Sequence, residues 1–172
     1  MKKSDKEVFL EPIDRNNFRK LFNMQLRNEQ ITFVTPPRWT LARCYVRQFG
    51  DSFEHLPHLI RAGDAVVGYA TTACDPNSPD NYWIDDIMIA AKEQGKGYGR
   101  AAMVEVLKMI VGRYPRCEAV RLTCFRANTN AAALYTSMGF EPTGDVDSEF
   151  GEPNYKLSGA AIDKFRVSRT AN

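Results

Sequence analysis

The chain has 172 residues, of which 44% are hydrophobic, and its 23 basic and 21 acidic side chains give a formal net charge of +2. This length favours a single domain, because single hydrophobic cores stop growing only beyond about 250 residues. The balanced charge and the lack of a run of five like charges argue against a nucleic-acid-binding arm, so no nucleic-acid partner is expected.

The cysteines and histidines do not form the pattern of a metal site. The four cysteines contain no CxxC pair, so we expect reduced thiols in a cytoplasmic protein and no metal. His55 and His58 are expected in a surface loop. The first residues lack the apolar run of a secretory signal, and no stretch reaches the roughly 18 apolar residues of a membrane span. Neither export nor a membrane partner is therefore expected.

The first half of the chain alternates between strand and helix signals. Strands are indicated by β-branched and aromatic runs, and helices by asparagine or proline before apolar residues at helical spacing. The predicted elements are a strand over 8–13, a helix from Asn16 or Asn17 to Leu26, a helix over 35–50 closed by Gly50, strands over 58–62 and 65–73 around a Gly63–Asp64 turn, and the longest, central strand over 82–90.

The second half predicts two helices, each followed by a strand. A helix over 98–111 carries apolar residues at helical spacing and stops near Gly112 and Pro115. The other predicted elements are a strand over 119–125, a helix over 128–139 and a strand over 154–158. A polar tail from 159 to 172, expected to be disordered, follows a single domain over 1–158.

The stretch QGKGYGR, Gln94 to Arg100, predicts an anion site. It lies between a predicted strand and a predicted helix, so it places unpaired backbone N–H groups at the positive end of that helix. Gly97 and Gly99 would let a diphosphate approach, and Lys96 and Arg100 add charge. A flexible turn is the alternative. A dinucleotide fingerprint is excluded because Arg100 occupies its third glycine position, and no nucleotide P-loop run exists.

Two motifs together resemble the GNAT superfamily of N-acyltransferases. Gln94, Gly97 and Gly99 match its acyl-CoA signature Q/R-x-x-G-x-G/A, and the run from Asn128 to Phe140 matches N-x-x-A-x-x-L-Y-x-x-x-G-F. The stretches NEQITFVTPPRWTLARCYV, YWIDDIMIAAKEQGKGYGRAAM and GFEPTGD are similar to a bacterial branch of diamine, spermine and spermidine N-acetyltransferases. The chain departs from that branch at Asp86, in place of arginine, and at Ala90, in place of aspartate.

The resemblance implies an α/β (α+β) fold. It consists of a mixed, mostly antiparallel sheet of about six to seven strands flanked by about four helices. The sheet splits in a V between the strands 82–90 and 119–124, and the pantetheine arm of acetyl-CoA lies in the opening. The residues assigned to this coenzyme are Ile87, Met88, Ile89, Gln94, Gly95, Lys96, Gly97, Tyr98, Gly99, Arg100, Asn128, Ala131 and Tyr135.

Two of these residues carry chemistry by the same resemblance. The N–H of Ile89 would face the thioester oxygen as an oxyanion donor, although the Ile89 side chain is equally suited to core packing. Tyr135 would lie near the leaving sulfur. Reference pKa values of about 8.5 for a thiol and about 10 for a phenol favour a hydrogen bond to the developing thiolate, completed by proton transfer. The alternative for Tyr135 is packing on its helix.

The acceptor is expected to be an amine that attacks directly, since no serine or cysteine has a matching base and orienting acid. An amine with a pKa near about 10.4 must first lose a proton. Asp85, Asp86 and Glu29 are the candidate bases or anchors, with solvated surface charges as the alternative. Strand alternation sends Asp85 and Asp86 to opposite faces. Trp83 is a candidate for cation–π contact with the amine, or else a core residue.

These readings predict a cytoplasmic, acetyl-CoA-dependent N-acetyltransferase of a small-molecule primary amine, with a polyamine or diamine as first choice. Acidic residues suited to a cationic substrate also occur at Asp75, Asp80, Asp145, Asp147 and Glu149. An aminoglycoside-type antibiotic, an amino acid or a protein N-terminus stays open as acceptor. A non-catalytic acyl-CoA-binding module and a nucleotide-dependent enzyme are the alternatives of other classes. A homodimer is expected.

Overall fold

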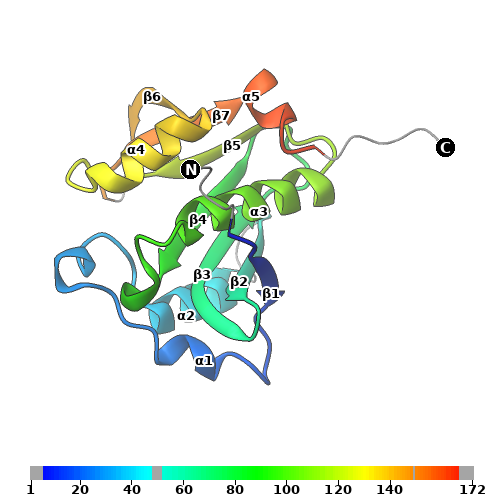
Figure 1. Cartoon of the computed structure of the whole chain (residues 1–172). Coiled ribbons are helices and arrows are strands. Elements are labelled where there is room, and N and C mark those ends of the chain that lie inside the picture. Colours follow the sequence, from blue (N-terminus) through cyan, green and yellow to red (C-terminus); the bar gives the residue numbers. More distant parts are fainter. Residues whose placement is uncertain (1–5, 48–51, 149, 167–172) are drawn as a thin grey trace.

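The computed structural model describes residues 6–47, 52–148 and 150–166. They form one sheet in the order β1-β2-β3-β4-β5-β7-β6, shown with its helices in Figure 1. The strands are β1 (Phe9–Pro12), β2 (Glu54–Ala62), β3 (Ala65–Cys74), β4 (Tyr82–Ile89), β5 (Ala119–Thr123), β6 (Glu141–Val146) and β7 (Pro153–Ser158). The helices are α1 (Arg19–Phe22), α2 (Pro37–Arg47), α3 (Tyr98–Arg113), α4 (Thr129–Met138) and α5 (Ala160–Asp163), with 3-10 turns η1 (Asn28–Gln30) and η2 (Ala91–Glu93).

Only β4 and β5 are parallel; every other neighbouring pair in the described sheet is antiparallel. The β4–β5 pair is registered at a single position, Trp83 opposite Arg121. Beyond that position β4 continues to Ile89 without a paired neighbour on its β5 side. The expected mixed sheet with a split between these two strands is therefore confirmed.

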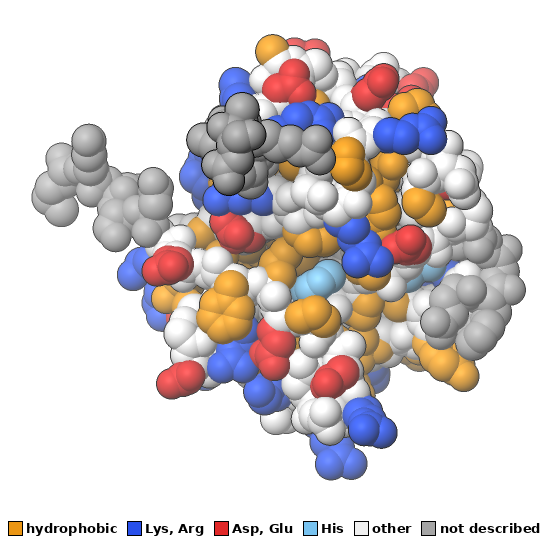
Figure 2. Space-filling view, turned by 90° about the vertical axis from the view of Figure 1, so that its right-hand side faces the viewer, with side chains coloured by type: hydrophobic (Ala, Val, Ile, Leu, Met, Phe, Trp, Pro, Cys, Tyr) orange, Lys and Arg blue, Asp and Glu red, His pale blue; other side chains and the backbone are white. Residues whose placement is uncertain are grey.

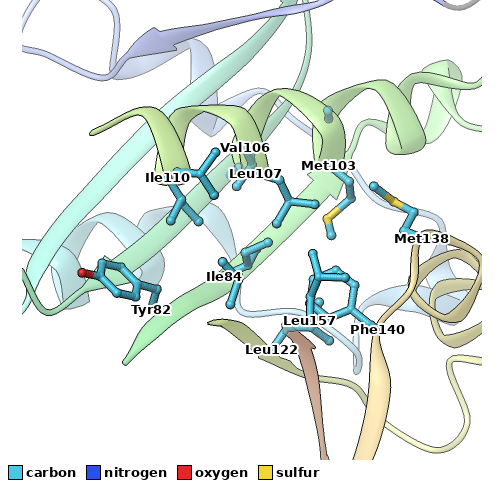
Figure 3. Packing of buried hydrophobic residues seen from close by; sticks show 14 of the residues in the cluster. Tyr82, Ile84, Met103, Val106, Leu107, Ile110, Leu122, Met138, Phe140 and Leu157 are labelled. Carbon is cyan, nitrogen blue, oxygen red and sulfur yellow. The ribbon is translucent and has the colours of Figure 1, made fainter. Parts of the chain in front are cut away.

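The sheet is covered on both faces. Helix α3 buries the side chains Ala102, Met103, Val106, Leu107, Ile110 and Val111 at helical spacing. Figure 3 shows Leu107 and Ile110 packed over Ile84 of β4, while Leu122 and Leu157 of the next two strands meet the same layer. A smaller cluster on the opposite face lies beneath α1 and α2. Helix α3 thus lies over β1, β3 and β4, beside the split between β4 and β5.

The predicted helix from Asn16 to Leu26 is wrong in length, since α1 has four residues. Asn17 does not cap it: its Oδ1 accepts a hydrogen bond from the Asp14 backbone N–H at 2.8 Å. The Asp14 carboxylate in turn accepts from the Asn16 and Asn17 backbone N–H groups. This local side-chain turn competes with the helix, as is usual for such residues. The second predicted helix is confirmed as α2, although its expected end at Gly50 lies outside the described residues.

The predicted turn at Gly63 is confirmed, with φ of 56°, but β2 begins earlier than expected. His55 and His58 therefore lie on β2 and not in a surface loop. Strand β3, with 10 residues, and not β4, with 8, is the longest. The predictions of the helix after the glycine stretch and of the helix capped by Asn128 are confirmed as α3 and α4.

Two elements near the C-terminus were not predicted. Strand β6 is a mostly exposed edge strand containing Pro142 and Gly144, and it pairs with β7 in an irregular register. Edge strands tolerate proline. Because β6 is also mostly exposed, its sequence lacks the hydrophobic alternation by which buried strands are recognised. The expectation of a disordered tail from Gly159 is wrong for its first residues, because α5 forms there and buries Ile162.

Gly68 on β3 allows the backbone of β4 to approach closely, because it has no side chain. A Cβ at Gly68 would lie 2.2 Å from the carbonyl oxygen of Met88, and backbone cannot yield as a side chain can. We expect Gly68→Ala to lower the free energy of unfolding by about 3 kcal/mol, measured by urea denaturation. Gly112→Ala on α3 is the control: nothing lies within 4 Å of its Cβ position, so it should raise stability by up to about 1 kcal/mol. Equal stability of the two variants would contradict this account.

Acidic and basic side chains are interspersed over the side of the molecule seen in Figure 2. Among the described helices, none is both long and apolar enough to cross a bilayer.

Candidate active site

Two cavities meet at the split between β4 and β5. The first, of about 260 Å³, lies between the glycine loop, β4 and α4 and is called the glycine arm. The second, of about 1000 Å³, lies between α2, β4, β5 and the β6–β7 connection and is called the acidic arm. The residues that line both arms are Phe33, Val34, Ile87, Asn128, Ala131 and Tyr135. The two arms are therefore parts of one cleft.

The glycine loop presents backbone donors that have no partner within the helix at the start of α3. Gly95 and Gly97 have φ values of 77° and 93°, which residues with a Cβ rarely adopt, and Gly97 is the N-cap of the helix. The first intrahelical bond runs from the Ala101 N–H to the Gly97 carbonyl. The N–H groups of Tyr98, Gly99 and Arg100 accordingly precede the ladder and point out of the helix end, which favours an anion.

The polar side chains of this loop have partners of their own. Gln94 Nε2 donates to the Ile89 carbonyl at 2.9 Å and to Gln30 Oε1 at 2.7 Å, so Gln94 holds the loop against β4. Lys96 pairs with Glu93 at 2.9 Å, and Arg100 donates to Ser137. Lys96 and Arg100 are both exposed, so either cation is free to turn toward a ligand.

The sequence expectation that Asp85 and Asp86 point to opposite faces is wrong. Thr71 of β3 lies opposite Asp86 and Thr72 lies opposite Ile84, so Asp85 is an extra residue in a β-bulge. A bulge interrupts the two-residue alternation of a strand. Both carboxylates consequently face α2 and line the acidic arm.

Asp86 is buried and held by three donors on its Oδ2 atom. Arg43 donates at 2.6 Å, Thr71 at 3.1 Å and Thr40 at 3.3 Å. Burial raises the pKa of Asp86, while Arg43 and the two hydroxyls counteract that rise. Asp86 thus forms part of the wall of the acidic arm, and Arg43 already compensates its charge.

Asp85 is held more loosely. Its Oδ2 lies 4.0 Å from Arg47 Nη1, and its side chain keeps 17% of its exposure. Burial raises the pKa of Asp85, with the Asp86 charge adding to the rise and Arg43 opposing it. A carboxyl group with a raised pKa that opens on a cleft is suited to accept a proton.

Glu152 also lines the acidic arm, although it is not among the residues predicted from the sequence. Burial raises the pKa of Glu152, and the neighbouring charges of Asp147 and Asp86 add to the effect. The acidic run before the last strand could have indicated Glu152. The sequence prediction named only Asp145, Asp147 and Glu149 in that run. Asp147 lines this arm, whereas Glu149 lies outside the described residues.

Tyr135 is at the junction of the arms. It comes from α4, whose first turn is capped by Asn128 Oδ1 accepting from the Ala131 N–H at 3.4 Å. The ring packs against Phe140, with ring centroids 6.0 Å apart, and the residue is 8% exposed. Burial raises the pKa of Tyr135, and the charges of Cys124 and Asp86 add to the rise. Its hydroxyl therefore stays protonated and available as a donor at neutral pH.

Three other predicted residues are placed differently from what their roles require. Glu29 is exposed on η1 and lines neither arm. Trp83 lines the acidic arm, yet its ring already faces the Arg121 guanidinium at 5.9 Å. Met88 lines the glycine arm, but its side chain belongs to the cluster beneath α1 and α2.

The cysteines are all unpaired and buried. Cys124 lines the acidic arm, where burial raises the pKa of its thiol to about 11. Over the described ranges, no three His, Cys, Asp or Glu side chains are grouped so that they could hold a metal ion.

Comparison with known proteins gives one family. Residues 18–140 match the Acetyltransferase (GNAT) family. The spermine/spermidine N(1)-acetyltransferase of Bacillus subtilis is 28% identical over 85 residues, which are 49% of this chain and 55% of that protein. The chain thus matches about half the length of this curated relative.

Solved structures agree in fold. The aminoglycoside acetyltransferase AAC(6')-Ib in complex with coenzyme A and kanamycin has a TM-score of 0.72 at 17% identity, over 92% of this chain and 98% of that one. A spermidine N-acetyltransferase SpeG chimera from Vibrio cholerae and hSSAT has a TM-score of 0.65 at 18% identity, over 92% and 97%.

Proposed function

The chain belongs to the acetyltransferase (GNAT) family, and on this premise we propose that it transfers the acetyl group of acetyl-CoA to a primary amine. The observation that carries the proposal is the continuity of the cleft. An arm that ends at free helix amides joins an arm lined by carboxylates, and the protonated hydroxyl of Tyr135 lies at the junction.

The glycine arm is suited to the coenzyme. The amides of Tyr98, Gly99 and Arg100 would bind the diphosphate, with Lys96 adding charge. The backbone of β4 from Ile87 to Ile89, unpaired on its β5 side, would bond the pantetheine arm as an added strand would. Gln94 supports this arrangement indirectly, because it fixes the loop to β4.

The transfer needs three proton movements. The ammonium group loses a proton, which Asp85 is best placed to accept through a water. The neutral amine nitrogen then bonds to the thioester carbon, with the Ile89 N–H facing the oxyanion. When the carbon–sulfur bond breaks, Tyr135 donates its proton to the leaving thiolate, and the second proton that the nitrogen gives up as it becomes an amide restores the Tyr135 hydroxyl. The products are an amide and coenzyme A with its thiol restored.

A polyamine or diamine is our first choice of acceptor. Four carboxylates line the acidic arm, Asp85, Asp86, Asp147 and Glu152, against the two cations Arg43 and Arg47. A multiply charged cation would gain from this surplus. An aminoglycoside offers the same ammonium groups on a bulkier frame, so acceptor size separates the two. Homodimer formation and a cytoplasmic location stay predictions of the sequence.

The proposal predicts acetyl-CoA-dependent thiol release with spermidine, spermine or putrescine, faster than with kanamycin or amino acids.

Gly97→Val should weaken coenzyme A binding at least tenfold in calorimetry, because a branched side chain strains this φ of 93° and covers the amides. Gly63→Val, with equally unusual backbone in a distant turn, should leave that affinity unchanged. Unaltered coenzyme A affinity in Gly97→Val, or no release with any amine, would refute the assignment.

A further inference from the structure

A third cavity, the side pocket, lies between α1, η1 and the start of α2. It has a volume of about 400 Å³, within the range of roughly 300–1000 Å³ typical of small-molecule sites. Nine residues line it, and all except Arg38 are apolar. Phe22 and Ile31 on its wall are 53% and 56% exposed. The pocket therefore leaves a concave apolar surface in contact with water, a feature that commonly marks a binding site.

The side pocket shares part of its lining with both arms of the cleft, and Pro36 lines the side pocket and the acidic arm. Val34 lines the side pocket, the glycine arm and the acidic arm. Leu26 and Met88 line both the side pocket and the glycine arm. Val34 is therefore the residue past which a group attached to the thioester carbon, near the meeting point of the arms, would extend into the side pocket.

We propose that the side pocket holds the alkyl chain of an acyl thioester longer than acetyl, so that a medium-chain acyl-CoA is a donor for this site. The inference rests on the proposed function. The covalent step is the same: the amine nitrogen bonds to the acyl carbon, the carbon–sulfur bond breaks, and coenzyme A leaves with a proton. Only the length of the transferred chain differs.

The composition of the side pocket selects an alkyl chain over a polar one. An ammonium group would find no carboxylate among the lining residues, and Arg38 would repel it. Arg38 is itself exposed, so its charge can remain in water while its stem covers the chain. Acyl groups that end in a carboxylate, such as succinyl, would gain from Arg38 alone and would lose contact with the apolar wall.

The direct test compares the binding of acetyl-, hexanoyl-, octanoyl- and succinyl-CoA by calorimetry without amine. Each buried methylene tightens binding by up to about fourfold, so octanoyl-CoA should bind at least tenfold more tightly than acetyl-CoA. Octanoyl affinity equal to or weaker than acetyl affinity, or a preference for succinyl-CoA, would overturn the proposal. Failure of coenzyme A itself to bind would instead refute the proposed function.

A substitution in the side pocket gives an independent readout. Ile31 lines the side pocket but neither arm of the cleft, and its side chain is already half-exposed. Ile31→Trp should therefore fill the side pocket without unfolding the chain. We expect it to abolish the octanoyl advantage while acetyl-CoA affinity stays within twofold. Phe9→Trp, at a comparably exposed apolar residue on β1, is the matched control and should preserve the advantage. If both variants keep it, the chain lies elsewhere and the inference is wrong.

Discussion

Replacing Tyr135 by phenylalanine is expected to lower kcat for acetyl transfer about 100-fold at pH 7.5, within the range that general acids supply. The ring keeps its contact with Phe140, so packing is preserved and only the donor is lost. The KM for acetyl-CoA should change little, because the hydroxyl acts on the sulfur as charge develops there. Thiol release in the presence of saturating amine measures both quantities.

The pH dependence distinguishes this role from packing. Burial keeps the pKa of Tyr135 above its ordinary value near 10, so the wild-type donor does not ionise between pH 6 and 9 and the variant should be slower across that range. Tyr155→Phe on β7, a partly buried tyrosine outside the cleft, should retain full activity. A Tyr135→Phe enzyme as fast as wild type at every pH would remove the proposed proton donor.

The sequence predicted the elements that are marked by capping residues and by apolar spacing within the element itself. Helix α4 follows from Asn128 at its start and Gly139, with φ of 100°, at its end. Helix α3 follows from apolar spacing and from the glycines before it. These signals lie within one element, so they do not depend on what packs against it. The glycine arm, which we propose as the cofactor half of the cleft, is built from these two helices and β4, and its residues could be named from the sequence for the same reason.

The acidic arm, which we propose as the acceptor half, could be predicted only in part. The sequence pointed to Trp83, Asp85 and Asp86, but their arrangement depends on register and on contacts between distant segments. Residue numbers alone place Asp85 and Asp86 on opposite faces, and only the pairing of β4 with Thr71 and Thr72 of β3 reveals the bulge. Glu29 was predicted as a base or anchor, but it lies on a short exposed 3-10 turn. Glu152 lines the cleft because β7 pairs with β5. No pattern within either strand predicts that pairing.

The bulge links the fold to the chemistry of the site. A regular β4 would direct one of the two carboxylates into the apolar layer beneath α3. The extra residue turns both toward α2, which supplies Arg43 and Arg47. The two carboxylates then differ: Asp86 is fixed in an ion pair, and Asp85 remains open to the cleft.

This division predicts that Arg43→Met destabilises the protein, by about 3 kcal/mol at pH 8, because breaking a buried pair leaves an uncompensated charge. Arg43 opposes the rise in the pKa of Asp86, so its removal raises that folded-state pKa further above the unfolded value near 3.9. The folded variant then holds a proton that the unfolded chain releases. Its stability should fall as the pH rises from about 4 to the folded-state pKa, and then level off.

Urea unfolding of the Arg43→Met variant at pH 5 and pH 8 tests the sign, with wild type measured alongside. Adding Asp86→Asn should recover most of the loss at pH 8 and reduce the pH dependence, because the neutral amide occupies the same space without the charge. The dependence that remains belongs to Asp85, whose pKa Arg43 also holds down. If Arg43→Met alone is equally stable at both pH values, the carboxylate of Asp86 does not depend on Arg43. The Arg43–Asp86 pair would then contribute little to stability, and the bulge would have no electrostatic reason to turn Asp86 toward α2.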